Sequence, residues 1–163
     1  MGGSEMTLDV SQVLKGLKLA TASVREGMRT GLAQAGMALL RDCVMDEPTV
    51  PLKEGTLRGS GSVFVNNELV QTSVGFPGAE AGTPCTDHQE RIPQENMVAV
   101  VGFNTPYAEY IHEGVRLDGT HKIVNWSEPG SGKKFMESKL LKYGKKYIGI
   151  VQRCIQEALE AGW

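Results

Sequence analysis

The stretch SVFVNNELVQTSVGF, residues 62–76, decides the fold class of this chain. It opens with a short β-branched and aromatic run, Val63 to Val65, and a second strand-like run follows from Leu69 to Phe76. The pair Asn66-Asn67 between them is a turn signal, and two such runs on either side of a turn predict a β-hairpin.

Long helical patterns flank the hairpin on both sides. Residues 8–45 and 134–161 repeat apolar side chains at spacings of three and four, which places them along one stripe of a helix. Pro48 and Pro51 end the first pattern, because proline cannot continue a helix. The first helix is also interrupted by three glycines: Gly27, Gly31 and Gly36. Each glycine costs about 1 kcal/mol relative to alanine, so the helix either bends there or meets another backbone closely.

A further apolar run, MVAVVGF at residues 97–103, predicts a third strand, and its continuous apolar character favours a central position. Strands placed between terminal helices predict an α+β fold. We expect a small antiparallel sheet packed against the long N-terminal and C-terminal helices.

The organisation predicted is a single domain. Its parts are a flexible N-terminus at 1–7, the domain at 8–163, an extended arm at 46–61, and long loops at 77–96 and 115–133. The last loop is expected to contain a short strand near 122–126.

Composition excludes several classes of protein. The 163 residues are 40% apolar and 22% charged, with a net charge of −2, which is unlike a generic DNA or membrane-surface binder. No apolar run approaches the roughly 18 residues of a membrane span. The N-terminal sequence lacks the layout of a signal peptide, so synthesis in a reducing cytoplasm is expected.

The three cysteines predict neither a disulfide framework nor a zinc site, because their count is odd and no CxxC pair occurs. Cys43 and Cys154 fall in helical patterns and are expected to be small core residues. Cys85 lies in the loop at 77–96.

No catalytic or cofactor motif is complete. SGKK at residues 131–134 lacks both the first glycine and the final Ser or Thr of a phosphate-binding loop. Ser60 lacks the context of a nucleophile elbow. The histidines never fall at metal-ligand spacing; they are His88, His112 and His121. We therefore predict that the chain is not an enzyme and binds no cofactor and no metal. The alternative is an enzyme that uses a cluster of residues in the stretch described next.

That stretch is NTPYAEYIHEG, residues 104–114. It predicts a short helix, with Thr105 as N-cap, Pro106 at the first helical position and Gly114 as C-cap. Its apolar surface is expected to pack on the core and comprises Tyr107, Ala108, Tyr110 and Ile111. An enzyme would instead use a cluster of Tyr107, Tyr110, His112 and Glu113.

The chain resembles a family of small neck and tail-completion proteins of long-tailed bacteriophages. PLKEGTLRGSG, residues 51–61, is similar to the family's P-x-x-T-G-x-L-R-x-S element, with Glu54 at the threonine position. VGFNTPYAEYIHEG, residues 101–114, resembles V-G-x-x-x-x-Y-A-x-Y-x-x-x-G. KFMESKL, residues 134–140, is similar to the K-F-L that opens the family's last helix.

The resemblance implies a structural virion protein at the neck, the head–tail junction, assembled in the host cytoplasm. Such proteins form homo-oligomeric rings, commonly hexameric, and contact head connector or adaptor proteins and the tail tube or tail terminator protein. DNA passes through their channel without sequence-specific binding, and no membrane is involved. A tail-terminator ring and a monomeric adaptor module are the alternatives.

A ring also implies contacts between subunits. The arm is expected to be mobile in the free subunit and ordered after assembly. The residues expected at the subunit or partner interface are Leu52, Leu57, Arg58, Val63 and Val65.

Overall fold

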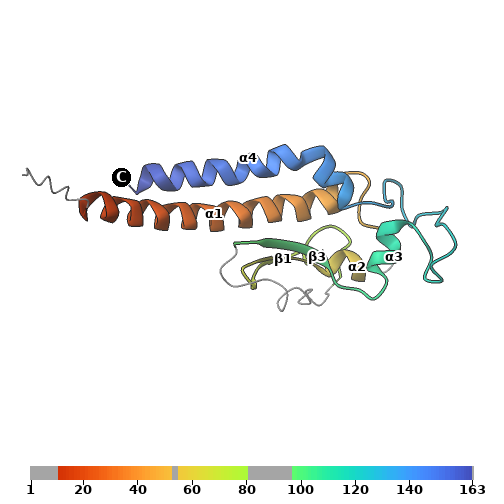
Figure 1. Cartoon of the computed structure of the whole chain (residues 1–163). Coiled ribbons are helices and arrows are strands. Elements are labelled where there is room, and N and C mark those ends of the chain that lie inside the picture. The colour runs from red at the N-terminus through yellow and green to blue at the C-terminus, as the bar shows by residue number, and fades with distance from the viewer. Residues whose placement is uncertain (1–10, 53–54, 81–96, 163) are drawn as a thin grey trace, which may run out of the picture.

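The computed structural model describes residues 11–52, 55–80 and 97–162, with the backbone alone at 11–20. Two long helices dominate it, α1 (Ser11–Met45) and α4 (Glu137–Ala161). They run side by side, and α1 lies between α4 and the sheet (Figure 1). The predicted α+β class is confirmed, and the element contacts show that α1 is the helix that packs on the sheet.

In the described part of the chain the sheet has three antiparallel strands, β1 (Gly61–Val65), β2 (Glu68–Thr72) and β3 (Ala99–Phe103), in the order β2-β1-β3. The predicted hairpin is confirmed. Asn66 and Asn67 both have positive φ, 49° and 67°. A two-residue turn of this kind matches the twist of the strands that it joins, and asparagine tolerates the left-handed conformation.

The prediction that residues 97–103 form the central strand is wrong. Within the described sheet β1 is central and β3 is an edge strand. All five residues of β1 are buried, whereas all five of β3 are only partly buried. The apolar character of β3 comes from its contact with α1. A helix can cover one face of an edge strand as well as one face of a central strand.

The glycines of α1 mark close approaches of neighbouring segments. A Cβ atom on Gly27 would lie 2.7 Å from the Cα of Ile155, and one on Gly31 would lie 2.7 Å from the Cα of Val151. Both distances are too short for real Cβ contacts, so the two helices meet here backbone to backbone. The predicted alternative of close packing is confirmed, and it explains why helix-weakening residues stand inside α1.

Polar pairs continue the contact between α1 and α4 toward the C-terminal end of α1. The hydroxyl of Tyr147 donates a hydrogen bond to Asp42 Oδ2 at 2.7 Å, and that of Tyr143 donates to Asp46 Oδ2 at 3.0 Å. A lysine of α4 lies 3.2 Å from each carboxylate. The four-residue spacing on both helices fixes their register with directional bonds.

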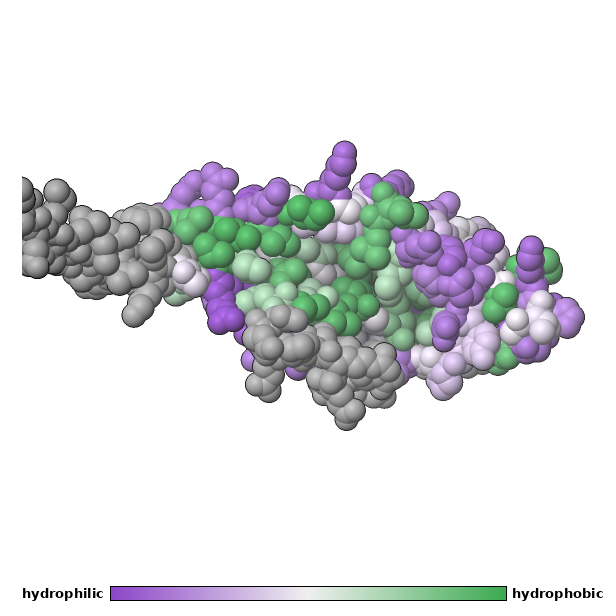
Figure 2. Space-filling view, in the orientation of Figure 1, coloured by the Kyte–Doolittle hydropathy of each residue, from purple (hydrophilic) through white to green (hydrophobic). Residues whose placement is uncertain are grey.

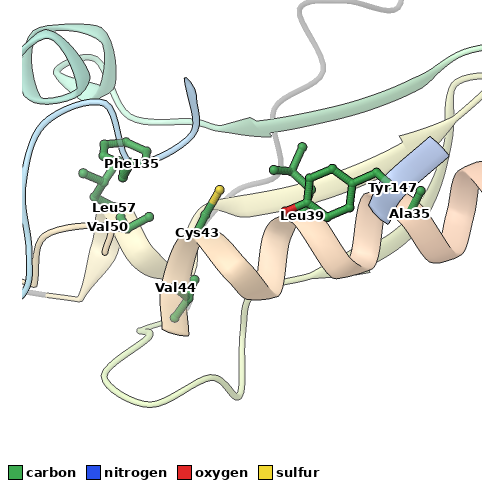
Figure 3. Packing of buried hydrophobic residues seen from close by; sticks show 8 residues of the cluster. All are labelled: Ala35, Leu39, Cys43, Val44, Val50, Leu57, Phe135 and Tyr147. Carbon is green, nitrogen blue, oxygen red and sulfur yellow. The ribbon is translucent and has the colours of Figure 1, made fainter. Parts of the chain in front are cut away.

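The core runs along α1 and continues into the segments that follow it. Cys43 and Cys154 are buried free thiols, as predicted, whereas Cys85 lies outside the described residues. Figure 3 shows the cluster spread along α1 toward α4 and the segment after α1. Its buried members are Ala35, Leu39, Cys43, Val44, Val50, Leu57, Phe135 and Tyr147.

The segment at 46–61 is not an extended arm throughout. Val50 is fully buried, residues Thr56–Gly59 form the short helix α2, and Gly61 already belongs to β1. Gly55 makes this possible because its φ of +78° starts α2 from a left-handed conformation. Val50 and Leu57 of this segment lie in the core, so the segment is part of the folded chain.

The other predicted irregular regions are covered in part. Residues 1–7 and most of 77–96 lie outside the described residues. The loop at 115–133 is irregular, as predicted, but the expected strand near 122–126 is reduced to a single bridge between Val115 and Lys122.

The glycine contact between the helices can be tested by a matched pair of substitutions. We expect Gly31→Ala to lower the free energy of unfolding by about 1 to 3 kcal/mol, because the new methyl group forces two backbones apart. Gly144→Ala, where a Cβ would meet nothing within 4 Å, should raise it by about 0.5 to 1 kcal/mol. Urea unfolding followed by circular dichroism measures both. Equal effects of the two substitutions would contradict the close contact.

Candidate functional site

The three sequence motifs converge at one end of the molecule, which we call the motif end and define as residues 46–60 and 104–136 among those described. Arg58 lies at its centre and is only 5% exposed. Its Nη2 and Nε donate to the carbonyl of Val50 at 2.7 and 3.2 Å, and its Nη1 donates to the carbonyl of Pro77 at 3.0 Å. Nη2 also forms an ion pair with Glu128. One rigid, planar guanidinium therefore joins three segments.

Ser60 links the first motif to the second. Its hydroxyl donates to the carbonyl of Leu57 at 2.8 Å and accepts the backbone N–H of Asn104 at 2.9 Å. The side chain is 1% exposed. A buried hydroxyl with both roles engaged in backbone bonds fixes the chain path after β3 and is not placed to act as a nucleophile.

Phe135 links the third motif to the second. It is 2% exposed and makes edge-to-face contacts with Phe103, at 5.5 Å between ring centroids, and with His112, at 4.9 Å. Aromatic pairs prefer this geometry. The start of α4 is therefore held against the end of β3 and the short helix that follows it.

Ion pairs reinforce the same junction on its surface. Lys134 Nζ lies 2.7 and 2.8 Å from the two carboxylate oxygens of Glu113 and 2.8 Å from Glu137. The hydrogen bond from Lys134, followed by that from His112, lowers the pKa of Glu113. His112 Nδ1 lies 3.2 Å from Glu113, and its Nε2 accepts the backbone N–H of Glu137 at 3.4 Å. These groups connect elements of the fold. The contacts therefore give a structural role to His112 and Glu113, two members of the cluster that the enzyme alternative requires.

The short helix of the second motif is α3 (Ala108–Glu113). Gly114 ends it with a φ of +74°, so the predicted C-cap is confirmed. The prediction of Thr105 as N-cap is wrong, because the carbonyl of Thr105 instead accepts the N–H of Ala108 at 3.0 Å. That bond closes a β-turn with Pro106 at its second position, where proline's fixed φ is favoured. Pro106 therefore precedes the helix and does not begin it.

The predicted apolar surface of α3 is confirmed in part. Tyr107, Ala108 and Ile111 are partly buried and pack against the core. Tyr110 is 39% exposed and is one of the exposed large apolar residues of the described chain. Tyr107, which precedes the helix, thus packs on the interior, whereas Tyr110 within the helix is exposed.

A cleft of about 590 Å³ opens between the first motif, the second motif and the loop after α3. Its volume lies in the range of ligand and peptide sites in proteins. The sequence does not reveal it, because its walls come from segments that are separated in the chain and carry no site pattern. The lining residues are Pro51, Gly55, Leu57, Tyr107, Ile111, Arg116, Leu117, Asp118 and Ile123.

The loop wall of the cleft is a closed turn. Asp118 Oδ1 accepts the backbone N–H of Thr120 at 2.9 Å and that of His121 at 3.1 Å, and Oδ2 lies 2.6 Å from His121 Nδ1. Hydrogen bonds from these groups, that of the Thr120 backbone first, lower the pKa of Asp118 to about 2. The carboxylate is therefore satisfied by its own turn.

Arg116 is the remaining charged residue of the lining. It is exposed, its backbone N–H donates to the carbonyl of His121 at 2.8 Å, and among the described residues its guanidinium has no hydrogen-bond or ion-pair partner. Among the described residues, the cleft thus combines an apolar floor with one available cation, Arg116, at its mouth. This arrangement can bind an apolar side chain next to an anionic group.

Four of the residues expected at a subunit interface are interior residues. Leu57, Arg58, Val63 and Val65 are at most 5% exposed, because packing and hydrogen bonds within the chain already occupy them. Leu52 is partly buried. The exposed large apolar residues are others: Met45, Leu69, Val70, Val74, Tyr110, Leu117, Val124, Leu140, Leu141 and Ile148. Figure 2 shows hydrophobic residues spread over the middle of one face of the molecule.

Buried ionisable groups lie near the motif end, and only their helical spacing marks them in the sequence. Lys139 is fully buried and donates to the carbonyl of Pro48 at 2.9 Å; burial lowers its pKa. Burial raises the pKa of the Cys43 thiol to about 12, although Lys139 opposes this shift. Since the thiolate is the reactive form, Cys43 is inert near neutral pH.

The described part of the chain shows neither a metal-binding cluster nor a membrane-spanning helix. Within it, no group of three or more His, Cys, Asp or Glu residues could hold a metal ion. None of the helices there is long and apolar enough to cross a membrane. Comparisons with protein-family models, with curated proteins and with solved structures found no match to this chain.

The turn around Asp118 makes a prediction about pH. Its folded pKa of about 2 lies below the ordinary value of 3.8, so its contribution to stability is present above pH 3.8 and is lost as the pH falls through 2. A carbon-13 NMR titration of the Asp118 carboxyl should therefore give a midpoint near 2. In His121→Ala the midpoint should rise only in part, because the backbone bonds remain. A midpoint near 4 in the unsubstituted protein would contradict the closed turn.

Proposed function

We propose that this chain is a structural protein of the phage neck, which completes the tail or joins head to tail as a homo-oligomeric ring around the DNA channel. The ring contacts head connector or adaptor proteins on one side and the tail tube or tail terminator on the other. DNA passes through it without sequence-specific binding.

The arrangement of the motifs supports this proposal. Residues 51–61, 101–114 and 134–140 resemble three elements of the neck family, in the same order and between the same kinds of secondary structure. Residues of the three motifs contact one another: Ser60 of the first accepts the backbone N–H of Asn104 in the second, and Phe135 of the third packs on His112 of the second. Such residues define the shape of a subunit end and serve no evident chemistry.

The observation that carries the proposal is the character of the surface at the motif end. The cleft has an apolar floor, and Tyr110, Leu117 and Val124 nearby are 39%, 66% and 75% exposed. Large apolar side chains left outside a well-packed core favour contact with another protein chain. A catalytic pocket would need convergent polar groups instead.

A tail-terminator ring has the same kind of subunit and differs in its partners, so it remains the second candidate within the same class. A monomeric adaptor would use the cleft for a partner without forming a ring. An enzyme is disfavoured by the contacts of His112 and Glu113, which are engaged with Phe135, Lys134 and the start of α4.

Imaging of intact particles tests the proposal. Cryo-electron microscopy of virions from the source should show, at the head–tail junction, a ring into which the paired helices α1 and α4 fit as the longest feature of each subunit. Deletion of the gene should yield filled heads and tails that do not join, or tails without a finished end. Particles that lack the chain and infect normally would refute the proposal.

A further inference from the structure

We propose that the cleft of one subunit receives the hairpin of the next copy, with Leu69 against the apolar floor and Glu68 against Arg116. This contact rests on the proposed ring and names the residues that join its subunits. It uses two surfaces of the same chain that are chemically complementary and lie at opposite ends of the sheet.

The hairpin offers an exposed acid followed by exposed apolar groups. Glu68, Leu69 and Val70 at the start of β2 are all exposed, with Leu69 at 49% and Val70 at 39%. Within the described sheet β2 is an edge strand. Exposed apolar residues on an edge strand invite association, and proteins usually cover or charge such edges. A neighbouring subunit is one way to cover this edge.

The positions of cleft and hairpin fit a head-to-tail contact. Gly61 pairs with Phe103 at the end of the sheet that adjoins α2 and α3, and Val65 pairs with Ala99 at the end that adjoins the hairpin turn. Figure 1 shows α3 beyond one end of the sheet. A contact between two different surfaces of identical copies propagates in one direction and closes into a ring when the rotation is suitable.

Charge favours this occupant over the other exposed apolar surface. The guanidinium of Arg116 has no hydrogen-bond or ion-pair partner among the described residues, so an acid next to the apolar anchor is preferred. Glu68 forms an ion pair with Arg29, but their side chains are 64% and 45% exposed, and such pairs contribute little. Replacing the Glu68–Arg29 pair by a pair between Glu68 and Arg116 therefore costs little free energy. The exposed Leu141 and Ile148 of α4 instead lie among lysines, whose charge would repel Arg116.

The test uses two double variants on exposed residues, so that folding is retained and can be checked by circular dichroism. The cleft variant carries Arg116→Glu and Leu117→Asp, and the hairpin variant carries Glu68→Arg and Leu69→Asp. Sedimentation velocity at up to millimolar concentration should show association of the wild-type chain and monomers for each variant alone. An equimolar mixture should form a dimer that grows no further, because it contains one intact cleft and one intact hairpin.

A charge exchange identifies the residue pair. Arg116→Glu or Glu68→Arg alone should weaken association by about tenfold or more, and the two together in one chain should recover most of the loss. Arg153→Glu, on the exposed face of α4, is the matched control and should leave association unchanged.

Two results would overturn the inference. One is a wild-type chain that remains monomeric at millimolar concentration, which is comparable to the effective concentration between neighbours in an assembly. The other is a mixture of variants that stays monomeric while the wild type associates. Particles whose neck ring forms from either variant would also refute this contact and leave the proposed function standing, whereas virions without the chain would refute the proposed function itself.

Discussion

The guanidinium of Arg58 reaches the carbonyls of Val50 and Pro77 and the carboxylate of Glu128, which belong to segments far apart in the sequence. Burying a cation is costly unless its hydrogen bonds and its charge are satisfied. Here both are, and the condition can be met only if all three segments are in place together. The walls of the cleft, which come from the same region, depend on this convergence.

Different interactions stabilise the helical pair and the motif end. Along α1 and α4 the helices pack closely at small residues such as Gly31. Hydrogen bonds from Tyr147 and Tyr143 to aspartates of α1 continue this contact. At the motif end, short irregular segments are joined by hydrogen bonds, ion pairs and the ring contacts of Phe135. A rigid helical pair thus carries a loop-built surface, which is a common way to present a binding site.

Local patterns in the sequence predicted the local structure well. The asparagine pair at 66–67 predicted the hairpin, the apolar spacing predicted both long helices, and Gly114 predicted the end of α3. The burial of Arg58 could not be predicted, because arginine is rarely buried and its acceptors are distant in the chain. The cleft could not be predicted either, because its walls come from segments that are distant in the chain. The apolar run of β3 did not indicate whether that strand is central or at an edge.

The most direct test of the role of Arg58 is hydrogen–deuterium exchange on Arg58→Lys, with Arg153→Lys as control. Lysine keeps the charge but cannot span the three acceptors. We predict faster exchange at Thr49 and Gly132, whose N–H groups bond the carbonyls of Gly130 and Thr49 across the motif end, while α1 and α4 keep their protection. Unchanged exchange at these amides, or a uniform loss that includes both helices, would contradict the account.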